Sequence, residues 1–397
     1  MYSWRSSHKA MVNLKAAVKE IKGVAKKDHV TAGIGIVKLA RKIWPAFQDI
    51  DGSSGSLGSA VCCALEDELV PLMISLDVEM SIRRKWLEQL KEALDDDGVD
   101  YLYPFRERWG ELCGYPELAN EWINQTRQEV QQVYARNRMT GEFVYSPLDT
   151  MCFSCLLFTG RYEELRELLS LKPYKVWHSE KYHAMALVKQ GRIDEAIAYA
   201  ESISESDDGT FDLSVKHFCE QALLDAGRPE EAYRRYGLQA LEGNTYLNQF
   251  RSIVRKYPTI DQRQILQDLI KATPMPSAWF SAARQAGYLD LAIKCAQSGN
   301  VDHSTLIRAG RDFQKKEPRF ALAVSMRALE LIIGGMYYEI TVREMIEAYG
   351  VAAHSAADIG CLDVVDNSLK KWMAQATPMD EVLRKHLEQE MSVARIA

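Results

Sequence analysis

Four residues have the types and spacing of a zinc-binding set. Cys152 and Cys155 form a Cys-x2-Cys pair, and His178 and His183 follow as a His-x4-His pair. Thiolate sulfur and imidazole nitrogen are the usual ligands of structural Zn²⁺. The stretch between the pairs is longer than in a zinc finger, and the cysteines lie in an apolar segment, where buried free thiols are common. The sequence therefore favours no bound metal, with a zinc module as an alternative.

The rest of the sequence shows no pattern typical of catalytic residues. A nucleophilic Ser or Cys needs an adjacent base, and no Gly-x-Ser-x-Gly elbow stands between a strand and a helix. Pairs of acids such as Glu163/Glu164 recur at predicted helix starts, where carboxylates stabilise the positive end of the helix dipole. Three histidines each stand alone in predicted helices: His217, His303 and His354. The sequence predicts a protein that is not an enzyme and has no cofactor.

The acid pairs belong to a recurring pattern of a glycine, two residues and an acid. The pattern occurs at Gly160, Gly191, Gly227, Gly287 and Gly360. The residues four before and five after each glycine are apolar or small. A glycine in the left-handed conformation ends a helix, and an acid in the next first turn stabilises the following one. We therefore expect these five glycines to be the structural turns of helix–turn–helix units.

The spacing of the glycines predicts a repeat of about 30 to 40 residues. The last two gaps are about twice the first two, and Pro258 and Pro318 stand where the missing turns would fall. Proline can break one helix and begin the next. The pattern resembles the tetratricopeptide class, which implies an all-α fold built as a right-handed α-solenoid.

The repeats divide the chain into three predicted parts. Residues 1–145 form an N-terminal helical domain, residues 146–376 hold seven helix-pair repeats, and residues 377–397 form a C-terminal capping helix. A charged terminal helix would shield the end of such an array. The pairs are expected at 147–158 with 162–170, 179–189 with 193–203, 212–226 with 229–241, 244–256 with 260–272, 276–286 with 288–298, 304–315 with 319–333, and 342–359 with 362–375.

Two helices are expected before residue 50. One covers residues 8–22, and the second begins after Asp28 as N-cap and ends at Pro45. A Gly/Ser-rich loop follows at residues 51–59. Its glycine spacing suggests phosphate binding, but no strand precedes it and no Gly-Lys-Ser/Thr closes it. The loop is more typical of a cap.

Ser56 or Ser59 is expected to cap the helix that follows this loop, over residues 60–69. Further on, regular helical sequence is interrupted at residues 136–145, and this interruption sets the predicted boundary between the N-terminal domain and the repeats.

Composition is that of an ordinary folded chain, with 47% hydrophobic and 26% charged residues. No apolar run approaches the roughly 20 residues that a membrane span requires, so no membrane contact is expected. The first 27 residues are too polar for a secretory signal, and the cysteines lie mostly in apolar segments. We therefore expect a cytoplasmic protein with reduced cysteines.

Charge is unevenly distributed along the chain. Residues 1–48 carry a net charge of +8 and the remainder −14, which gives the total of −6. A basic segment can bind nucleic acid through its phosphates. It can equally dock on the acidic body of its own chain, which is the favoured interpretation. Nucleic-acid binding by residues 1–48 is kept as an alternative.

The order of elements resembles that of a known group of proteins. Basic helices precede the loop Asp51-Gly52-Ser53-Ser54-Gly55-Ser56-Leu57-Gly58, and Trp86-Leu87-Glu88-Gln89-Leu90 and Asp95-Asp96-Asp97-Gly98 precede the repeats. This order resembles uncharacterised bacterial helical-repeat proteins related to those attached to SWIM zinc fingers. The Cys-x-Cys and Cys-x-His pairs of that zinc module are absent from the sequence. The resemblance therefore implies a helical fold and no activity.

The leading functional hypothesis is a non-enzymatic scaffold that binds protein or peptide. Stacked helix pairs present a concave face built from the first helix of each pair, where peptides commonly bind. Because several candidates there are basic, an acidic partner is expected. The candidate partner-binding residues are Lys181, Tyr182, Lys189, Lys216, Asn248, Arg251, Arg255, Trp279 and Arg284. The oligomeric state is left open.

Overall fold

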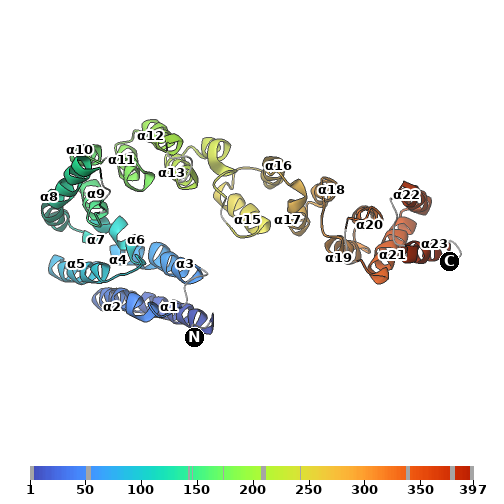
Figure 1. The fold of residues 1–397 in the computed structure, drawn as a ribbon, viewed down its shortest axis with the longest axis horizontal. Coiled ribbons are helices and arrows are strands. Elements are labelled where there is room, and N and C mark those ends of the chain that lie inside the picture. Colours follow the sequence, from blue (N-terminus) through green and yellow to red (C-terminus); the bar gives the residue numbers. More distant parts are fainter. Residues whose placement is uncertain are drawn as a thin grey trace. The chain divides into compact units, whose positions relative to one another are not determined.

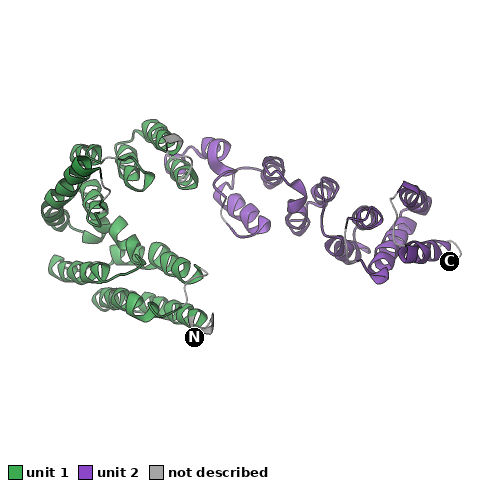
Figure 2. Ribbon diagram, viewed as in Figure 1, with its two compact units in different colours: residues 1–222 green, residues 223–397 purple. Residues whose placement is uncertain are grey.

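The chain folds into helices in the part that the structure, a computed structural model, describes (Figure 1). The described residues are 4–50, 55–141, 144, 146–172, 174–206, 212–241, 243–336, 340–375 and 381–393. They form two compact units, unit 1 (Met1–Ala222) and unit 2 (Leu223–Ala397), coloured separately in Figure 2. The division falls inside a helix of the predicted repeat region rather than near residue 145.

Unit 1 contains the two basic N-terminal helices, a group of short helices and the first helix pairs. Its helices are α1 (Trp4–Ala25), α2 (His29–Phe47), α3 (Ser56–Cys63), a π-helical segment (Ala64–Leu69), α4 (Val70–Ser75), α5 (Met80–Asp95), α6 (Tyr103–Glu107), α7 (Trp109–Cys113), α8 (Pro116–Thr140), α9 (Asp149–Phe158), α10 (Tyr162–Ser170), α11 (Trp177–Lys189), α12 (Ile193–Ser206) and most of α13 (Asp212–Asp225).

Unit 2 continues with helix pairs and a final single helix. It contains α14 (Pro229–Ala232), a π-helical segment (Tyr233–Gly237), α15 (Tyr246–Lys256), α16 (Gln262–Ala272), a 3-10 turn (Pro276–Trp279), α17 (Phe280–Gln285), α18 (Leu289–Gln297), α19 (His303–Phe313), α20 (Pro318–Ile333), α21 (Val342–Asp358), α22 (Leu362–Gln375) and α23 (Glu381–Val393). These bounds lie within a few residues of the predicted pairs, except that the helix expected over 229–241 ends at Gly237. Residues 377–380 and 394–397 of the predicted capping helix lie outside the described residues.

Three local predictions for unit 1 are wrong. Pro45 does not end α2, which continues through it to Phe47. Neither Ser56 nor Ser59 is the N-cap of α3: that position is Gly55, with φ 68°, and the Ser59 hydroxyl donates back to the Gly55 carbonyl at 3.0 Å. The third error is the interruption expected from residue 136, because α8 continues to Thr140. Residues 51–54 of the Gly/Ser loop lie outside the described residues.

The π-helical segment of unit 1 has a local cause. Pro71 has no backbone N–H, so the regular helical bond at that position is lost. The proline ring also clashes with the carbonyl four residues earlier, and the N–H of the preceding residue, Val70, bonds to the carbonyl of Leu65, five residues earlier. The change of pitch leaves Leu65 and Leu69 buried in the core.

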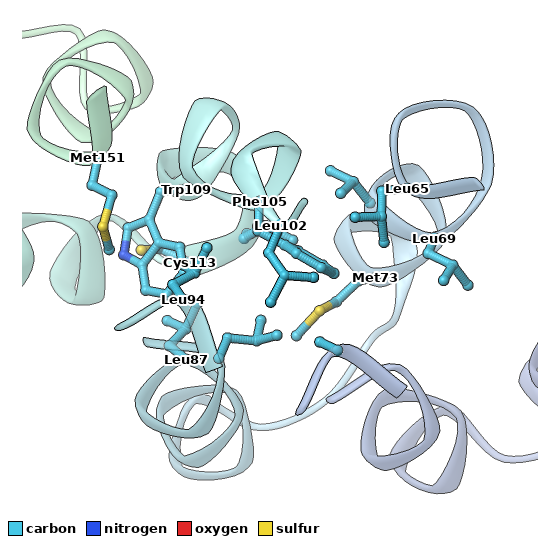
Figure 3. Close-up of a cluster of buried hydrophobic side chains, with 14 of the residues drawn as sticks. Leu65, Leu69, Met73, Leu87, Leu94, Leu102, Phe105, Trp109, Cys113 and Met151 are labelled. Carbon is cyan, nitrogen blue, oxygen red and sulfur yellow. The ribbon is translucent and has the colours of Figure 1, made fainter. Parts of the chain in front are cut away.

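The core of unit 1 runs continuously from its N-terminal helices to α11. Figure 3 shows its centre, where side chains from the π-helical segment, α4, α5, α6, α7 and α9 meet. Phe105 and Trp109 are fully buried there. Large apolar side chains of this kind stabilise a fold by roughly 1.5–3 kcal/mol each when buried.

All five repeat glycines have the left-handed conformation, with φ between 71° and 87°. After each of them, the next backbone N–H bonds to the carbonyl five residues back, from Arg161, Arg192, Arg228, Tyr288 and Cys361 to Leu156, Leu187, Leu223, Ala283 and Ala356. This is the six-residue bond of the Schellman motif, which satisfies carbonyls that a helix end leaves unpaired. The five acceptor residues are buried. Each glycine thus ends its helix, while the buried residue four positions before the glycine holds that end in the core.

Arginine and glutamate close three of these turns in a way that the sequence analysis missed. Arg161, Arg192 and Arg228 directly follow their glycines, and each donates through Nε and a terminal nitrogen to a glutamate three residues on: Glu164, Glu195 and Glu231. The bonds lower the pKa of each glutamate below its ordinary value. The spacing Gly-Arg-x-x-Glu was visible in the sequence. The second acid of each pair therefore has a structural partner.

Gly191→Ala tests the cost of the left-handed turn. Its φ is 76°, and no atom lies within 4 Å of where a Cβ would be, so the change introduces backbone strain without a clash. We expect a loss of about 1 kcal/mol in the free energy of unfolding, measured by urea denaturation. Asparagine tolerates this conformation better, so Gly191→Asn should lose less. Equal losses for both variants would contradict a conformational cause.

Candidate functional site

A groove in unit 1 brings together three of the predicted partner-binding residues. It has a volume of about 330 Å³ and is lined by α6, α7, α9 and α11, with Lys181, Tyr182 and Lys189 on α11. Tyr182 is 2% exposed, and its hydroxyl donates to the Glu107 carbonyl at 3.0 Å. Lys181 forms an ion pair with the Glu107 carboxylate. Only Lys189 is both exposed and in no ion pair with a described residue. Two of the three candidates thus already have partners within the fold.

A second groove, in unit 2, contains Asn248, Arg251 and Arg255; we call it the arginine groove. It lies along α15 and the adjoining ends of α16 and α17, and its volume is about 590 Å³. Arg251 and Arg255 are exposed one turn apart on the same face of α15. Neither guanidinium forms an ion pair with a described residue; the Arg255 Nε donates to the Arg251 carbonyl at 3.3 Å. Leu247 and Val254 give the groove an apolar component.

The electrostatics of the arginine groove are positive. Helix α15 contains no acidic residue and has three basic ones, Arg251, Arg255 and Lys256. The arginines remain charged at all physiological pH values, and a guanidinium can form two parallel hydrogen bonds with one carboxylate. The groove can therefore bind carboxylates or phosphates beside an apolar contact.

Two of the remaining three candidates, Trp279 and Lys216, have partners within the fold. Trp279 is 0% exposed, and its indole N–H donates to the Thr273 hydroxyl at 2.8 Å, so it is a core residue. Lys216 forms an ion pair with Asp212, one turn earlier in α13. Arg284 is half-buried on α17, with its Nε buried and unpartnered. Helical periodicity alone could not show that Tyr182 and Trp279 face inward.

The four residues of the zinc alternative do not converge. Cys152 and Cys155 are fully buried on α9, and burial raises the pKa of Cys152 to about 11, which disfavours the thiolate that binds zinc. The His178 Nδ1 lies 3.6 Å from a Glu107 carboxylate oxygen, whereas the His183 ring packs on Tyr199 with centroids 4.7 Å apart. The described part of the chain holds no group of three or more His, Cys, Asp or Glu residues that could bind a metal ion. The spacing therefore does not correspond to a zinc site in this structure.

A buried polar cluster in unit 1 was not expected from the sequence. Asp149, in the first turn of α9, is 5% exposed; it accepts from the Tyr134 hydroxyl at 2.7 Å and from the Lys172 ammonium at 3.2 Å. Lys172 also donates to the Ser179 hydroxyl at 2.6 Å. Burial and the Asp149 charge raise the pKa of Tyr134 well above its ordinary value. One indication of this cluster was present in the sequence: Asp149 is an acid in the first turn of an otherwise apolar helix.

This cluster lines a cavity of about 350 Å³, yet its chemistry is that of structural support. The Lys172 ammonium donates to both the Asp149 carboxylate and the Ser179 hydroxyl. Tyr134 donates its hydroxyl proton to Asp149. The cluster therefore joins α8, α9 and α11 through hydrogen bonds between polar side chains.

The basic N-terminal segment has both free and paired cations. Lys22 of α1 bonds to Glu68 at 2.7 Å, and Arg41 of α2 lies 3.7 Å from Glu92 of α5. Seven further lysines of α1, α2 and the turn between them are exposed: Lys9, Lys15, Lys19, Lys26, Lys27, Lys38 and Lys42. The segment thus docks in part on acids of its own unit and leaves a basic surface.

Comparison with known proteins identifies no relative: no protein family matches the chain, and no curated protein has a significant match to it. Within the described residues, none of the helices combines the length and apolar character needed to cross a bilayer. The resemblance to helical-repeat proteins related to those with SWIM zinc fingers stays a prediction.

Proposed function

We propose that the protein is a non-enzymatic scaffold that binds an acidic protein segment in the arginine groove. The observation that carries this proposal is the pair of exposed guanidinium groups, Arg251 and Arg255, that line one groove without an ion-pair partner among the described residues. Arg263 of the same unit is paired with Asp290, whereas Arg308 and Arg343 are exposed and in no ion pair with a described residue but do not line the arginine groove. Two unpaired arginines on one face of one helix favour an external anion.

The scaffold part of the proposal rests on how the helices pack. In addition to contacts within a pair, first helices contact the next first helices, as in α9 with α11, α15 with α17 and α19 with α21. Second helices do the same, as in α18 with α20 and α20 with α22. This packing, together with the five glycine turns, favours a right-handed α-solenoid of tetratricopeptide-like repeats. In such an array the first helices line the binding face.

The expected partner follows from the chemistry of the groove. Arg251 and Arg255 favour binding of carboxylates, and Leu247 and Val254 in the same groove can contact an apolar side chain of the partner. A peptide segment with two acids and a neighbouring apolar residue would satisfy both. Hydrogen bonds to charged groups contribute about 1.5–3 kcal/mol each, enough for a binding energy that depends strongly on the arginines.

Charge reversal of the groove tests this function. We expect Arg251→Glu/Arg255→Glu to weaken binding of a labelled Glu- and Leu-containing peptide by about tenfold or more, measured by fluorescence anisotropy. The matched control is Arg308→Glu/Arg343→Glu, which changes the charge of unit 2 equally at exposed arginines on α19 and α21. Equal weakening by both variants would show a nonspecific charge effect, and no binding by the unmodified protein would overturn the proposal.

Nucleic-acid binding by residues 1–48 is the second candidate function. The seven exposed lysines support this function. Lysines that neutralise backbone phosphates release the counterions bound to the nucleic acid, and this release strengthens binding. Its signature differs from that of peptide binding in unit 2: affinity for a DNA duplex would fall steeply with salt and would not depend on Arg251.

A further inference from the structure

The two N-terminal helices form another groove in unit 1, which we call the N-terminal groove. It lies between α1 and α2, is open to solvent, and has a volume of about 410 Å³. On α1 it extends from Lys9 to Ala17, about 12 Å at the helical rise of 1.5 Å per residue. The groove is therefore about two helical turns long. It belongs to unit 1 and is independent of the arginine groove.

The floor of this groove is apolar. Leu14 of α1 and Ile43 and Phe47 of α2 form its base, and each is buried. Ala17 of α1 and Ala46 of α2 also line the groove, and both have short side chains. A groove with an apolar floor can accept the apolar side chains of a partner helix.

The edges of the groove are basic on both sides. Lys9 borders it on α1 and Lys42 on α2, both are exposed, and neither is in an ion pair with a described residue. Because α1 and α2 are joined by a short turn after Ala25 and run antiparallel, the two lysines lie near the same end of the helix pair. Asn13 adds a neutral polar group at the edge.

We propose that the N-terminal groove binds an amphipathic helix of a partner protein whose apolar stripe is flanked by acidic residues. Two or three apolar side chains at helical spacing would fit a floor about two turns long, as in other helix-in-groove complexes. The flanking carboxylates would face Lys9 and Lys42. The basic edges therefore require negatively charged residues on the partner helix, and the apolar floor requires an apolar stripe between them.

The same features distinguish this partner from others. A nucleic-acid backbone would use the lysines but gain nothing from Leu14, Ile43 and Phe47, since phosphate contacts dominate such binding. An anionic bilayer would prefer a flat or convex basic surface with protruding aromatic side chains. The N-terminal groove instead has its apolar groups recessed between two basic edges.

Two variants separate the apolar and charged parts of the interaction. Ala46→Trp fills the groove at an exposed position, and Lys9→Glu/Lys42→Glu reverses both edges. The matched control, Lys26→Glu/Lys27→Glu, makes the same charge change in the exposed turn between α1 and α2. Circular dichroism of each variant verifies that the helices are retained.

The probes are two labelled amphipathic helical peptides with the same Leu stripe, one flanked by Glu and one by Lys, together with a DNA duplex and phosphatidylserine vesicles. We expect the Glu-flanked peptide to bind, about tenfold weaker binding after either groove change, and less than about a twofold effect in the control. The Lys9→Glu/Lys42→Glu variant should instead bind the Lys-flanked peptide more tightly than the unmodified protein does.

Three results would overturn the proposal. One is affinity for the Glu-flanked peptide that Ala46→Trp leaves unchanged, because the apolar floor would then play no part. Another is equal weakening by the control, which would show nonspecific attraction. The third is tight binding of DNA or of phosphatidylserine vesicles, lost in all lysine variants, with no binding of the peptide. That pattern would assign the basic segment to nucleic acid or to an anionic surface.

Discussion

Replacing Gly110 by alanine should destabilise unit 1 by about 3 kcal/mol or more. Gly110 lies in α7, where that helix contacts α9, and a Cβ there would stand 2.2 Å from the Ser154 carbonyl oxygen and 2.7 Å from the Phe158 Cβ. Both obstacles are close to the backbone of α9, so no side-chain rotation relieves them. Forcing extra volume into a packed core costs about 1–3 kcal/mol, and a clash with backbone belongs at the upper end.

Two further variants test whether the clash of the added Cβ causes the loss of stability in Gly110→Ala. The Gly110 N–H donates to the Ser154 hydroxyl at 3.0 Å, so Ser154→Ala removes that bond alone and should cost about 1 kcal/mol. Gly23→Ala is the opposite case: it lies in α1 with no atom within 4 Å of the added Cβ, and it should stabilise the helix by about 0.5–1 kcal/mol. Urea denaturation measures all three. A loss below about 1 kcal/mol for Gly110→Ala would show that α7 and α9 can separate at little cost.

The position of Gly110 illustrates a limit of reading structure from sequence. The five repeat glycines could be found because each turn is built from residues within ten positions of one another, and the same pattern recurs. Gly110 has no such pattern. Its importance comes from Ser154 and Phe158, which are far along the chain, so only the packing of α7 on α9 reveals it.

The same contrast applies to the candidate partner-binding residues. A helix was expected over 244–256 and α15 covers Tyr246–Lys256, and Arg251 and Arg255 lie on one face of it because they are four residues apart. Tyr182 and Trp279 were assigned to a binding surface although both are buried. An amphipathic aromatic residue can take either side of a helix, and its hydrogen-bond partner decides which. For Tyr182 that partner is the carbonyl of Glu107, which no local pattern indicates.

The acid pairs at the repeat starts show how a partly correct interpretation can miss the main interaction. A favourable effect on the helix dipole was expected from both acids of each pair. The structure adds a two-point hydrogen bond from Arg161, Arg192 or Arg228 to the second acid. Because the arginine follows the left-handed glycine, it links the end of one helix to the start of the next.

Removing the Asp149 carboxylate is the second change expected to have a large effect. In Asp149→Ala the Lys172 ammonium, whose side chain is 13% exposed, loses its ion-pair partner, and the Tyr134 hydroxyl loses its acceptor. Breaking a buried pair costs about 3–5 kcal/mol because one charge stays buried and uncompensated. We expect about 3 kcal/mol for Asp149→Ala by urea denaturation, since Lys172 keeps its bond to Ser179.

The double variant Asp149→Ala/Lys172→Met tests whether the uncompensated charge of Lys172 causes the loss of stability in Asp149→Ala. Methionine retains most of the apolar stem of Lys172 and removes the ammonium, whose nitrogen lies 5.5 Å from the centroid of the Tyr134 ring and 5.7 Å from that of the Phe153 ring. If buried charge dominates, the double variant should be more stable than Asp149→Ala alone, with a coupling of about 1 kcal/mol or more. The exposed pair Arg84–Glu121 is the comparison: Glu121→Ala should cost less than about 1 kcal/mol. Additive losses at Asp149 and Lys172 would instead place the energy in packing, and the cluster would then join α8, α9 and α11 by shape rather than by charge.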